Sequence, residues 1–166
     1  MVDIILIAHN LRSSHNVGSL LRTAEGLGVN RTILSGYTPY PIQANDQRLP
    51  HLAQKIDKQI AKTALGAETM VNCQYIDDLE TQLTELKAQG YSLVGLEQSA
   101  SSITLQDFYP PDKMVLIVGR EVEGIESEII ARCDQLIEIP MLGQKESFNV
   151  VQAAAMALYQ LRFGKL

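Results

Sequence analysis

Polar side chains that could hold a ligand follow a short apolar segment near the C-terminal end of the chain. Residues 139–150 read Ile-Pro-Met-Leu-Gly-Gln-Lys-Glu-Ser-Phe-Asn-Val and lead into an Ala-rich run with helical spacing. Pro140 and Gly143 interrupt regular structure, and Ser147 is of the type that caps the first turn of a helix. The first N–H groups of a helix have no partner within it, so they can bind polar ligand atoms. The sequence therefore predicts a ligand-binding loop that ends in a helix N-terminus.

Three loops of the chain are unusually polar, and each follows a short apolar segment of the kind that forms a strand. They span residues 10–18, 119–125 and 140–149. The first contains Asn16 and the second contains Glu121, side chains that can form strong hydrogen bonds. In open α/β sheets, the loops at the carboxyl ends of the strands bind the ligand. We therefore expect the three loops to form a single site at one edge of a sheet.

The glycines of the second loop do not match the common nucleotide-binding patterns. Gly119-x-Glu121-x-x-Gly124 differs from the dinucleotide motif G-x-G-x-x-G. The chain also contains neither the phosphate loop G-x-x-x-x-G-K-[ST] nor the nucleophile elbow G-x-S-x-G. Neither an NAD-dependent enzyme nor an NTPase is indicated.

Short apolar segments alternate with amphipathic segments along most of the chain. Strands are predicted over residues 3–9, 32–35, 71–76, 91–96, 114–118 and 136–139, and helices over residues 17–27, 77–89, 127–133 and 149–161. The uninterrupted apolar run 114–118 is typical of a central strand buried on both faces. This alternation predicts an α/β fold with a mostly parallel sheet and helices on both faces.

Length and composition predict one domain over residues 1–166. A chain of this length with 46% hydrophobic residues can bury about 70% of the surface that it exposes when unfolded. The start of the chain lacks a basic leader, and no uncharged run reaches the ~18 residues of a membrane span. The two cysteines belong to no paired motif, and the three histidines show no metal-ligand spacing. We expect a cytoplasmic protein without a metal site or a membrane segment.

Charge is distributed unevenly along the chain. Residues 1–70 hold seven Lys/Arg and five Asp/Glu, or +2, and residues 71–166 hold seven and fourteen, or −7, which together give the net −5. A basic segment follows two tyrosines in the first part, and the residues involved are Tyr37, Tyr40, Arg48, Lys55, Lys58 and Lys62. This mixture suits RNA phosphates and unstacked bases. An ordinary solvated helix face explains it equally well.

Taken together, the three loops resemble the motifs of the SpoU family of RNA 2′-O-methyltransferases, within the knotted SPOUT superfamily. The matching motifs are Asn16-x-Gly18-x-x-x-Arg22, Gly119-x-Glu121-x-x-Gly124 and Ile139-Pro140-Met141-x-Gly143-x-x-x-Ser147-Phe148-Asn149. Phe148 stands where the family usually has Leu, and Val151 where it often has Ser. The resemblance spans nearly the whole chain, so we expect no appended RNA-binding domain.

The resemblance implies a C-terminal trefoil knot, S-adenosylmethionine as the cofactor, a homodimer, and tRNA or rRNA as the substrate. The residues that it implies for cofactor binding are Leu96, Gly119, Ile139, Met141, Ser147 and Phe148. An apolar slot with free backbone groups at its edges suits a flat adenine. Core packing is the competing role of Met141 and Phe148.

The resemblance also implies a catalytic group made of Arg22, Asn16, Glu121, Ser147 and Asn149. Arginine stays protonated in proteins, so Arg22 would stabilise a developing alkoxide rather than accept its proton. Local sequence alone favours a surface ion pair between Arg22 and Glu25, and it assigns Glu121 an equally good role in bracing its loop. Methylation of a base, or binding without catalysis, are the alternative functions.

Overall fold

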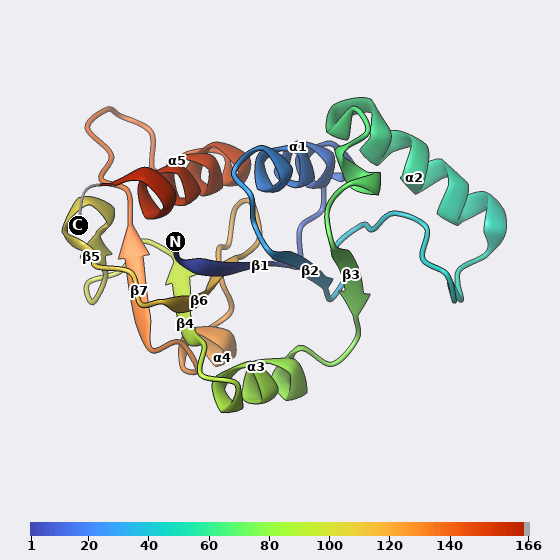
Figure 1. The fold of residues 1–166 in the computed structure, drawn as a ribbon. Coiled ribbons are helices and arrows are strands. Elements are labelled where there is room, and N and C mark those ends of the chain that lie inside the picture. Colours follow the sequence, from blue (N-terminus) through green and yellow to red (C-terminus); the bar gives the residue numbers. More distant parts are fainter. Residues whose placement is uncertain (165–166) are drawn as a thin grey trace.

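A seven-stranded parallel sheet forms the centre of the computed structural model, which describes residues 1–164 (Figure 1). The strands are β1 (Asp3–His9), β2 (Arg31–Ser35), β3 (Cys73–Ile76), β4 (Ser92–Leu96), β5 (Ile103–Thr104), β6 (Lys113–Val118) and β7 (Gln135–Glu138). Their order across the sheet is β3-β2-β1-β6-β4-β7-β5, and all neighbouring pairs are parallel. The predicted α/β fold is confirmed, and the trefoil knot stays a prediction.

Helices cover both faces of the sheet, as expected. They are α1 (Ser14–Gly26), α2 (Pro50–Ala64), α3 (Leu79–Ala88), α4 (Ser127–Ile130) and α5 (Val150–Phe163), with two short 3-10 turns, η1 (Ala67–Thr69) and η2 (Leu105–Asp107). Helices α1, α2 and α5 lie above the sheet in Figure 1, and α3 and α4 lie below it. No helix within residues 1–164 is long and apolar enough to cross a membrane.

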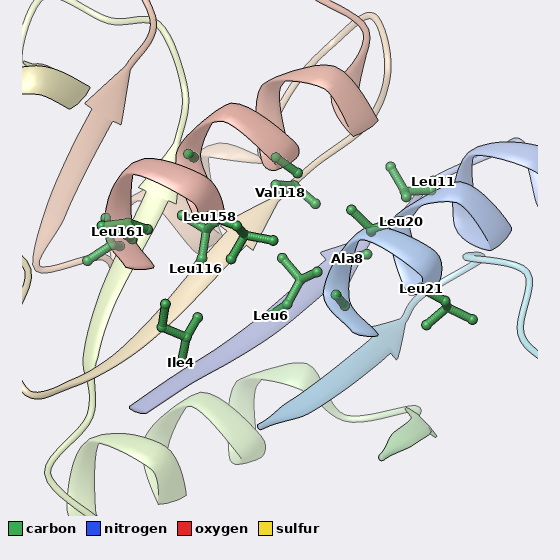
Figure 2. Close-up of a cluster of buried hydrophobic side chains, with 14 of the residues drawn as sticks. Ile4, Leu6, Ala8, Leu11, Leu20, Leu21, Leu116, Val118, Leu158 and Leu161 are labelled. Carbon is green, nitrogen blue, oxygen red and sulfur yellow. The ribbon is translucent and has the colours of Figure 1, made fainter. Parts of the chain in front are cut away.

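Alternate side chains of the central strands pack into two separate cores. Ile4, Leu6 and Ala8 of β1 pack with α1 and α5 (Figure 2), whereas Ile5 and Ile7 pack with α3 and α4 on the other face. This follows from the period of two in a strand. Because β1 and β6 are covered on both faces, their sequences are almost uninterruptedly apolar.

Several predicted boundaries differ from the structure by up to three residues. The helix expected over residues 127–133 ends at Ile130, and the strand expected from residue 71 begins at Cys73. The two-residue edge strand β5 was not predicted, because so short a segment carries no periodic signal. These differences lie at the ends and edge of the sheet and leave its centre as expected.

Helices α1 and α2 approach each other closely at Gly18. A Cβ atom at this position would lie 2.2 Å from both the Ile60 carbonyl oxygen and Thr63 Oγ1, and 3.0 Å from the Ala64 nitrogen. Thr63 Oγ1 also donates a hydrogen bond of 2.8 Å to the His15 carbonyl. Gly18, which belongs to the first motif, therefore permits close packing of two helices.

We predict that Gly18→Ala destabilises the protein by about 2 kcal/mol, because overpacking outweighs the helix propensity gained. Gly26→Ala in the same helix is the matched control, since a Cβ atom there meets nothing within 4 Å. The control should be neutral or stabilising by up to ~1 kcal/mol. Urea unfolding of the two variants measures the difference, and equal stabilities would contradict the packing role of Gly18.

Candidate functional site

A pocket opens at the carboxyl ends of β4, β6 and β7, beside the first turn of α5. Its volume is about 650 Å³ when the solvent at its open mouth is included. It is lined by Leu96, Glu97, Gln98, Val118, Gly119, Arg120, Glu121, Val122, Gly124, Glu138, Ile139, Ser147, Phe148, Val150 and Ala153. Two of the three polar loops contribute directly to this lining, at the edge of the sheet where the sequence placed them.

Five of the six residues expected to bind a cofactor lie in this lining. They are Leu96, Gly119, Ile139, Ser147 and Phe148. Met141 is half-buried and lies outside the lining. Phe148 remains 36% exposed, so it forms part of the pocket surface rather than the core. The roles of these residues in binding stay predictions.

The Glu121 carboxylate joins the second loop to the start of α1. Its oxygens accept hydrogen bonds from the backbone N–H groups of Arg12, at 3.1 and 3.2 Å, and Ser13, at 3.1 Å. Asn16 Nδ2 donates a third bond of 3.1 Å to Glu121 Oε1. Ser13 caps α1 by accepting a bond from the Asn16 nitrogen, so the carboxylate lies at a helix N-terminus, where negative charge is favoured.

These contacts lower the pKa of Glu121 below its ordinary value. Burial by itself raises the pKa of Glu121. Hydrogen bonds from its own N–H, from the N–H groups of Arg12 and Ser13 and from the Asn16 amide together lower the pKa by more than burial raises it. The carboxylate is therefore ionised at neutral pH and serves as an acceptor. The contacts support the bracing role that local sequence suggested for Glu121.

The Asn149 side chain connects the third loop to Asn16 and, through it, to Glu121. Asn149 Nδ2 donates to Asn16 Oδ1 at 3.4 Å, and Asn149 Oδ1 accepts the Val151 N–H at 2.9 Å. Glu121, Asn16 and Asn149 thus form a polar relay that links all three loops. The prediction of Ser147 as the helix cap is wrong, because α5 begins at Val150 and Asn149 caps it.

Arg22 lies apart from this relay. Its side chain is exposed and is not among the pocket residues, and no ion pair within residues 1–164 joins it to Glu25. It follows Asn16 by six residues on α1, which places the two side chains about 120° apart around the helix axis. Asn16 is bonded to Glu121 and Asn149, so the predicted orientation of Arg22 by Asn16 finds no support in this arrangement.

Sequence reasoning missed Glu97, which holds the second loop from the other side. Glu97 Oε2 accepts the Ile125 N–H at 2.7 Å and lies where a Cβ atom on Gly124 would be, 2.2 Å away. Gly124 also has a φ of 74°, which favours glycine. Glu97 follows β4 directly, and this position at the carboxyl end of a strand was the signal that could have identified it.

A second polar cluster, also missed, lies at the end of β1 and adjoins the pocket through Arg120. Asn10 Nδ2 donates to Glu126 Oε1 at 2.7 Å, and His9 Nε2 and the Arg120 guanidinium each lie 3.6 Å from the Glu126 carboxylate. Burial lowers the pKa of His9, although Glu126 partly opposes this effect. His9 Nδ1 is bonded to Ser35 Oγ at 2.8 Å. These contacts hold Arg120 at the pocket wall.

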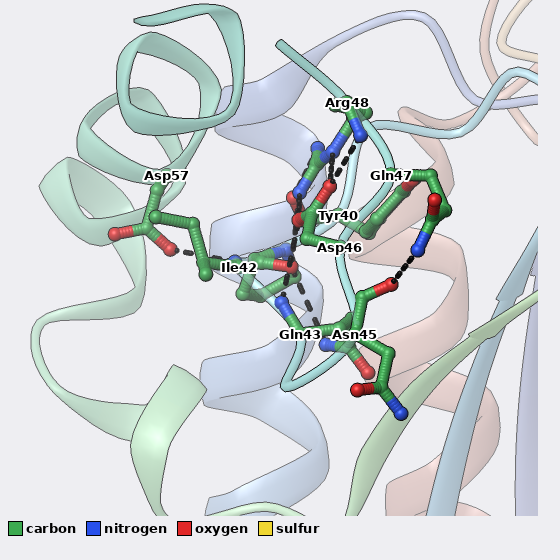
Figure 3. A network of polar contacts seen from close by, with 9 residues as sticks. Tyr40, Ile42, Gln43, Asn45, Asp46, Gln47, Arg48 and Asp57 are labelled. Atoms are coloured by element: carbon green, nitrogen blue, oxygen red, sulfur yellow. Dashed lines mark hydrogen bonds and ion pairs between the residues drawn. The ribbon is translucent and has the colours of Figure 1, made fainter. Parts of the chain in front are cut away.

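The structure corrects the RNA-binding interpretation of Tyr40 and Arg48. Tyr40 stacks on Tyr75 with ring centroids 3.9 Å apart, and the Arg48 guanidinium lies 3.5 Å from the other face of the ring. Arg48 also pairs with Asp46 and donates to the Tyr40 carbonyl at 2.9 Å (Figure 3). Both faces of the Tyr40 ring are covered, so it cannot stack on a base.

Neither cysteine is suited to act as a nucleophile. Burial raises the pKa of the Cys73 thiol to about 12 and that of Cys133 to about 11. Both thiols are therefore protonated at neutral pH and pack as small apolar groups. Within residues 1–164, no group of three or more His, Cys, Asp or Glu side chains is arranged to hold a metal ion.

Comparison with known proteins agrees with this geometry. The family model of the SpoU rRNA Methylase family matches residues 3–159. The chain belongs to this family. The match covers the strands β1 to β7 and most of α5, and therefore includes the whole pocket of this SpoU family member.

Several relatives within the family have names that describe their activity. The chain is 31% identical to a 23S rRNA (guanosine-2′-O-)-methyltransferase of Neisseria meningitidis, over 96% of its own length and 58% of the relative. It is 28% identical to a tRNA (guanosine(18)-2′-O)-methyltransferase of Aquifex aeolicus, over 95% and 68%. Its fold matches an rRNA methyltransferase from Sinorhizobium meliloti, solved with AdoMet bound, with a TM-score of 0.82, 21% identity, and coverage of 99% and 57%. The chain thus spans little more than half of the Neisseria protein.

Variants of Asn149 separate its two bonds. Asn149→Ala should destabilise the protein by about 1 kcal/mol because it removes the cap of α5. Asn149→Asp keeps an acceptor for the Val151 N–H and adds a favourable charge at the helix N-terminus, so it should stay within ~0.5 kcal/mol of the wild type. Thermal unfolding measures both values, and an equal loss in the two variants would contradict the assignment of Asn149 as the cap.

Glu121 should stabilise the fold only where it is ionised. Its pKa is lowered in the folded state from the ordinary 4.5, so its contribution is present above that pH and is lost as the pH falls through the folded value. We predict that Glu121→Gln lowers the unfolding free energy at pH 7 by about 1 kcal/mol. The difference from the wild type should shrink below pH 4.5. A difference that stays constant across this range in urea titrations would contradict the bracing role.

Proposed function

We propose that this protein is an S-adenosylmethionine-dependent RNA methyltransferase that acts on a ribose 2′-hydroxyl of tRNA or rRNA. The observation that carries the proposal is the polar relay of Glu121, Asn16 and Asn149, which joins the three motif loops beside one pocket. The Neisseria and Aquifex relatives, named as guanosine 2′-O-methyltransferases of rRNA and tRNA, support the reaction type. A cytoplasmic location and one functional domain over residues 1–166 belong to the same proposal.

The residues of the pocket fit the proposed cofactor. Leu96, Ile139 and Phe148 supply apolar surface for a flat adenine, and the volume lies within the usual ligand range of about 300–1,000 Å³. Glu97, Glu121 and Glu138 make the polar side of the pocket acidic. Such a lining suits a cofactor that carries ammonium and sulfonium charges. When bound, the cofactor would supply the methyl group.

The chain must position the ribose hydroxyl and stabilise the charge that develops on its oxygen. Ser147 lines the pocket and Asn149 lies next to the lining residues Phe148 and Val150; both side chains are exposed, so they are available to a bound ribose. Glu121 has its oxygens occupied by Arg12, Ser13 and Asn16, so it holds the loops rather than the substrate. Arg22 would stabilise the alkoxide because its guanidinium remains charged.

A homodimer would provide the proposed site with a cation that one protomer leaves outside its pocket. Arg22 is exposed and outside the lining, so a second copy is the source that could deliver it. Helix α5 carries an exposed apolar surface, with Met156 at 37%, Tyr159 at 60% and Phe163 at 61% exposure. Exposed apolar groups of this kind are typical of protein contact surfaces. We therefore propose that α5 and α1 contribute to the dimer interface.

Arg22→Lys tests the mechanism. Replacing the planar guanidinium should lower the rate of methyl transfer by about 10²–10³-fold while leaving cofactor affinity unchanged. Arg132→Lys is the control, because Arg132 pairs with Glu80 on the far face of the sheet. The measurement is transfer of labelled methyl groups to RNA, with calorimetry for the cofactor. Near-normal transfer by the Arg22 variant would remove it from the mechanism.

Nucleoside analysis of the same RNA distinguishes the rival reaction. A 2′-O-methylated nucleoside supports the proposed function, whereas methylation of a base nitrogen replaces it with a base-modifying activity. Cofactor binding without transfer to any tRNA or rRNA would instead indicate a binding protein. RNA from a deletion strain is the best substrate, since its target positions are unmodified.

A further inference from the structure

Helix α2 presents a stripe of basic side chains on one face. Lys55, Lys58 and Lys62 fall within about 60° of one another around the helix axis, and His51 continues the line one turn earlier. All four are exposed. The buried residues Ala53, Ile60 and Ala64 occupy the opposite side. We call Lys55, Lys58 and Lys62 the lysine stripe; it extends over about 10 Å.

The charge of the lysine stripe is not compensated by neighbouring acids. None of the ion pairs within residues 1–164 involves Lys55, Lys58 or Lys62, whereas Lys87 and Arg132 elsewhere are paired with Asp134 and Glu80. Asp57 is the single acidic residue of α2, and its carboxylate accepts the Ile42 N–H at 3.0 Å. A solvated face would usually mix both signs, most of all on a chain with net charge −5.

Packing places the C-terminal end of the lysine stripe at the pocket edge of the sheet. Thr63, next to Lys62, donates to the His15 carbonyl, and Ile60 and Thr63 leave no space beside Gly18. The neighbouring Asn16 is bonded to Glu121 in the pocket lining. The C-terminal end of α2 therefore lies beside the first turn of α1, and Figure 1 shows α2 extending from there past the β3 end of the sheet, away from β4 and β7.

We propose that the lysine stripe binds the phosphate backbone of the RNA whose ribose enters the pocket, an inference that rests on the proposed function. Local positive charge attracts RNA even when the whole protein is acidic. Both faces of the Tyr40 ring are covered, so this ring adds no base stacking, and phosphate contacts from lysines carry no sequence information. An anionic membrane fits less well, because the apolar side of α2 is already packed against α1 and cannot insert.

Replacing all three lysines with glutamine tests the lysine stripe. The slope of log Kd against log salt for unmodified tRNA and an rRNA transcript should become shallower by about 2–3, since each lost phosphate contact removes ~0.7–0.9. KM for RNA should rise, while calorimetric cofactor affinity and the far-UV helix signal stay unchanged. A slope equal to that of the wild type would overturn the inference.

Matched single variants separate position from total charge. Lys58→Gln should weaken RNA binding and reduce the slope by about 0.7–0.9, whereas Lys58→Arg should not. Lys113→Gln is the control, because this exposed lysine is the first residue of β6 and so lies at the amino end of that strand, whereas the pocket lies at the carboxyl ends. Equal losses of RNA affinity in Lys58→Gln and Lys113→Gln would mean that only the net charge of the protein matters, and they would overturn the inference.

The same measurements distinguish this inference from the proposed function. RNA binding that depends on the lysine stripe without any methyl transfer would refute the proposed reaction and keep the surface. Methyl transfer with an unchanged salt slope in the triple variant would refute RNA binding by the lysine stripe and leave the proposed reaction standing. Binding to phosphatidylserine vesicles but not to RNA, lost in the triple variant, would replace RNA with a membrane as the partner.

Discussion

The arrangement of the site depends on one half-buried carboxylate and its donors. Glu121 lies at the N-terminus of α1 and accepts the N–H groups of Arg12 and Ser13 and the amide of Asn16. A charge in this position is stable only while those donors stay in place. The requirement fixes the loop after β6 against the start of α1, and Asn149 then attaches the start of α5 to the same group. Three segments far apart in the chain are thus held together by electrostatics at one sheet edge.

Helix α1 connects this site to the rest of the molecule. Its first turn holds Glu121, its apolar stripe packs on β1 and against α5, and Gly18 lets α2 approach to backbone contact. A glycine in the middle of a helix costs about 1 kcal/mol of propensity, so its presence indicates a packing requirement. Helix α1, which supplies Asn16 to the polar relay, thus also determines the position of α2 and of the lysine stripe.

The division of charge follows this architecture. The pocket side is rich in carboxylates, with Glu97, Glu121 and Glu138 in its lining, while the lysines of α2 form no ion pair with any residue of the described range 1–164. An acidic cavity and a basic outer helix suit two different ligands of opposite charge. Under the proposed function, these would be a cationic cofactor and a polyanionic RNA. The net charge of the chain conceals this separation, because the two contributions partly cancel.

The sequence by itself determined six of the seven strands, most helices and the three loops, because apolar periodicity and motif spacing are local properties. It also identified Glu121, Asn16 and Asn149 through the family resemblance. The tertiary structure alone decided the strand order, the covered faces of Tyr40, the remote position of Arg22, and the cap of α5 at Asn149 instead of Ser147. The strand order, the covered faces of Tyr40 and the position of Arg22 depend on contacts between residues distant in the chain, whose geometry no local pattern contains. The cap is a local bond between Asn149 and the Val151 N–H, but where the preceding loop ends and the helix begins depends on how the loop packs.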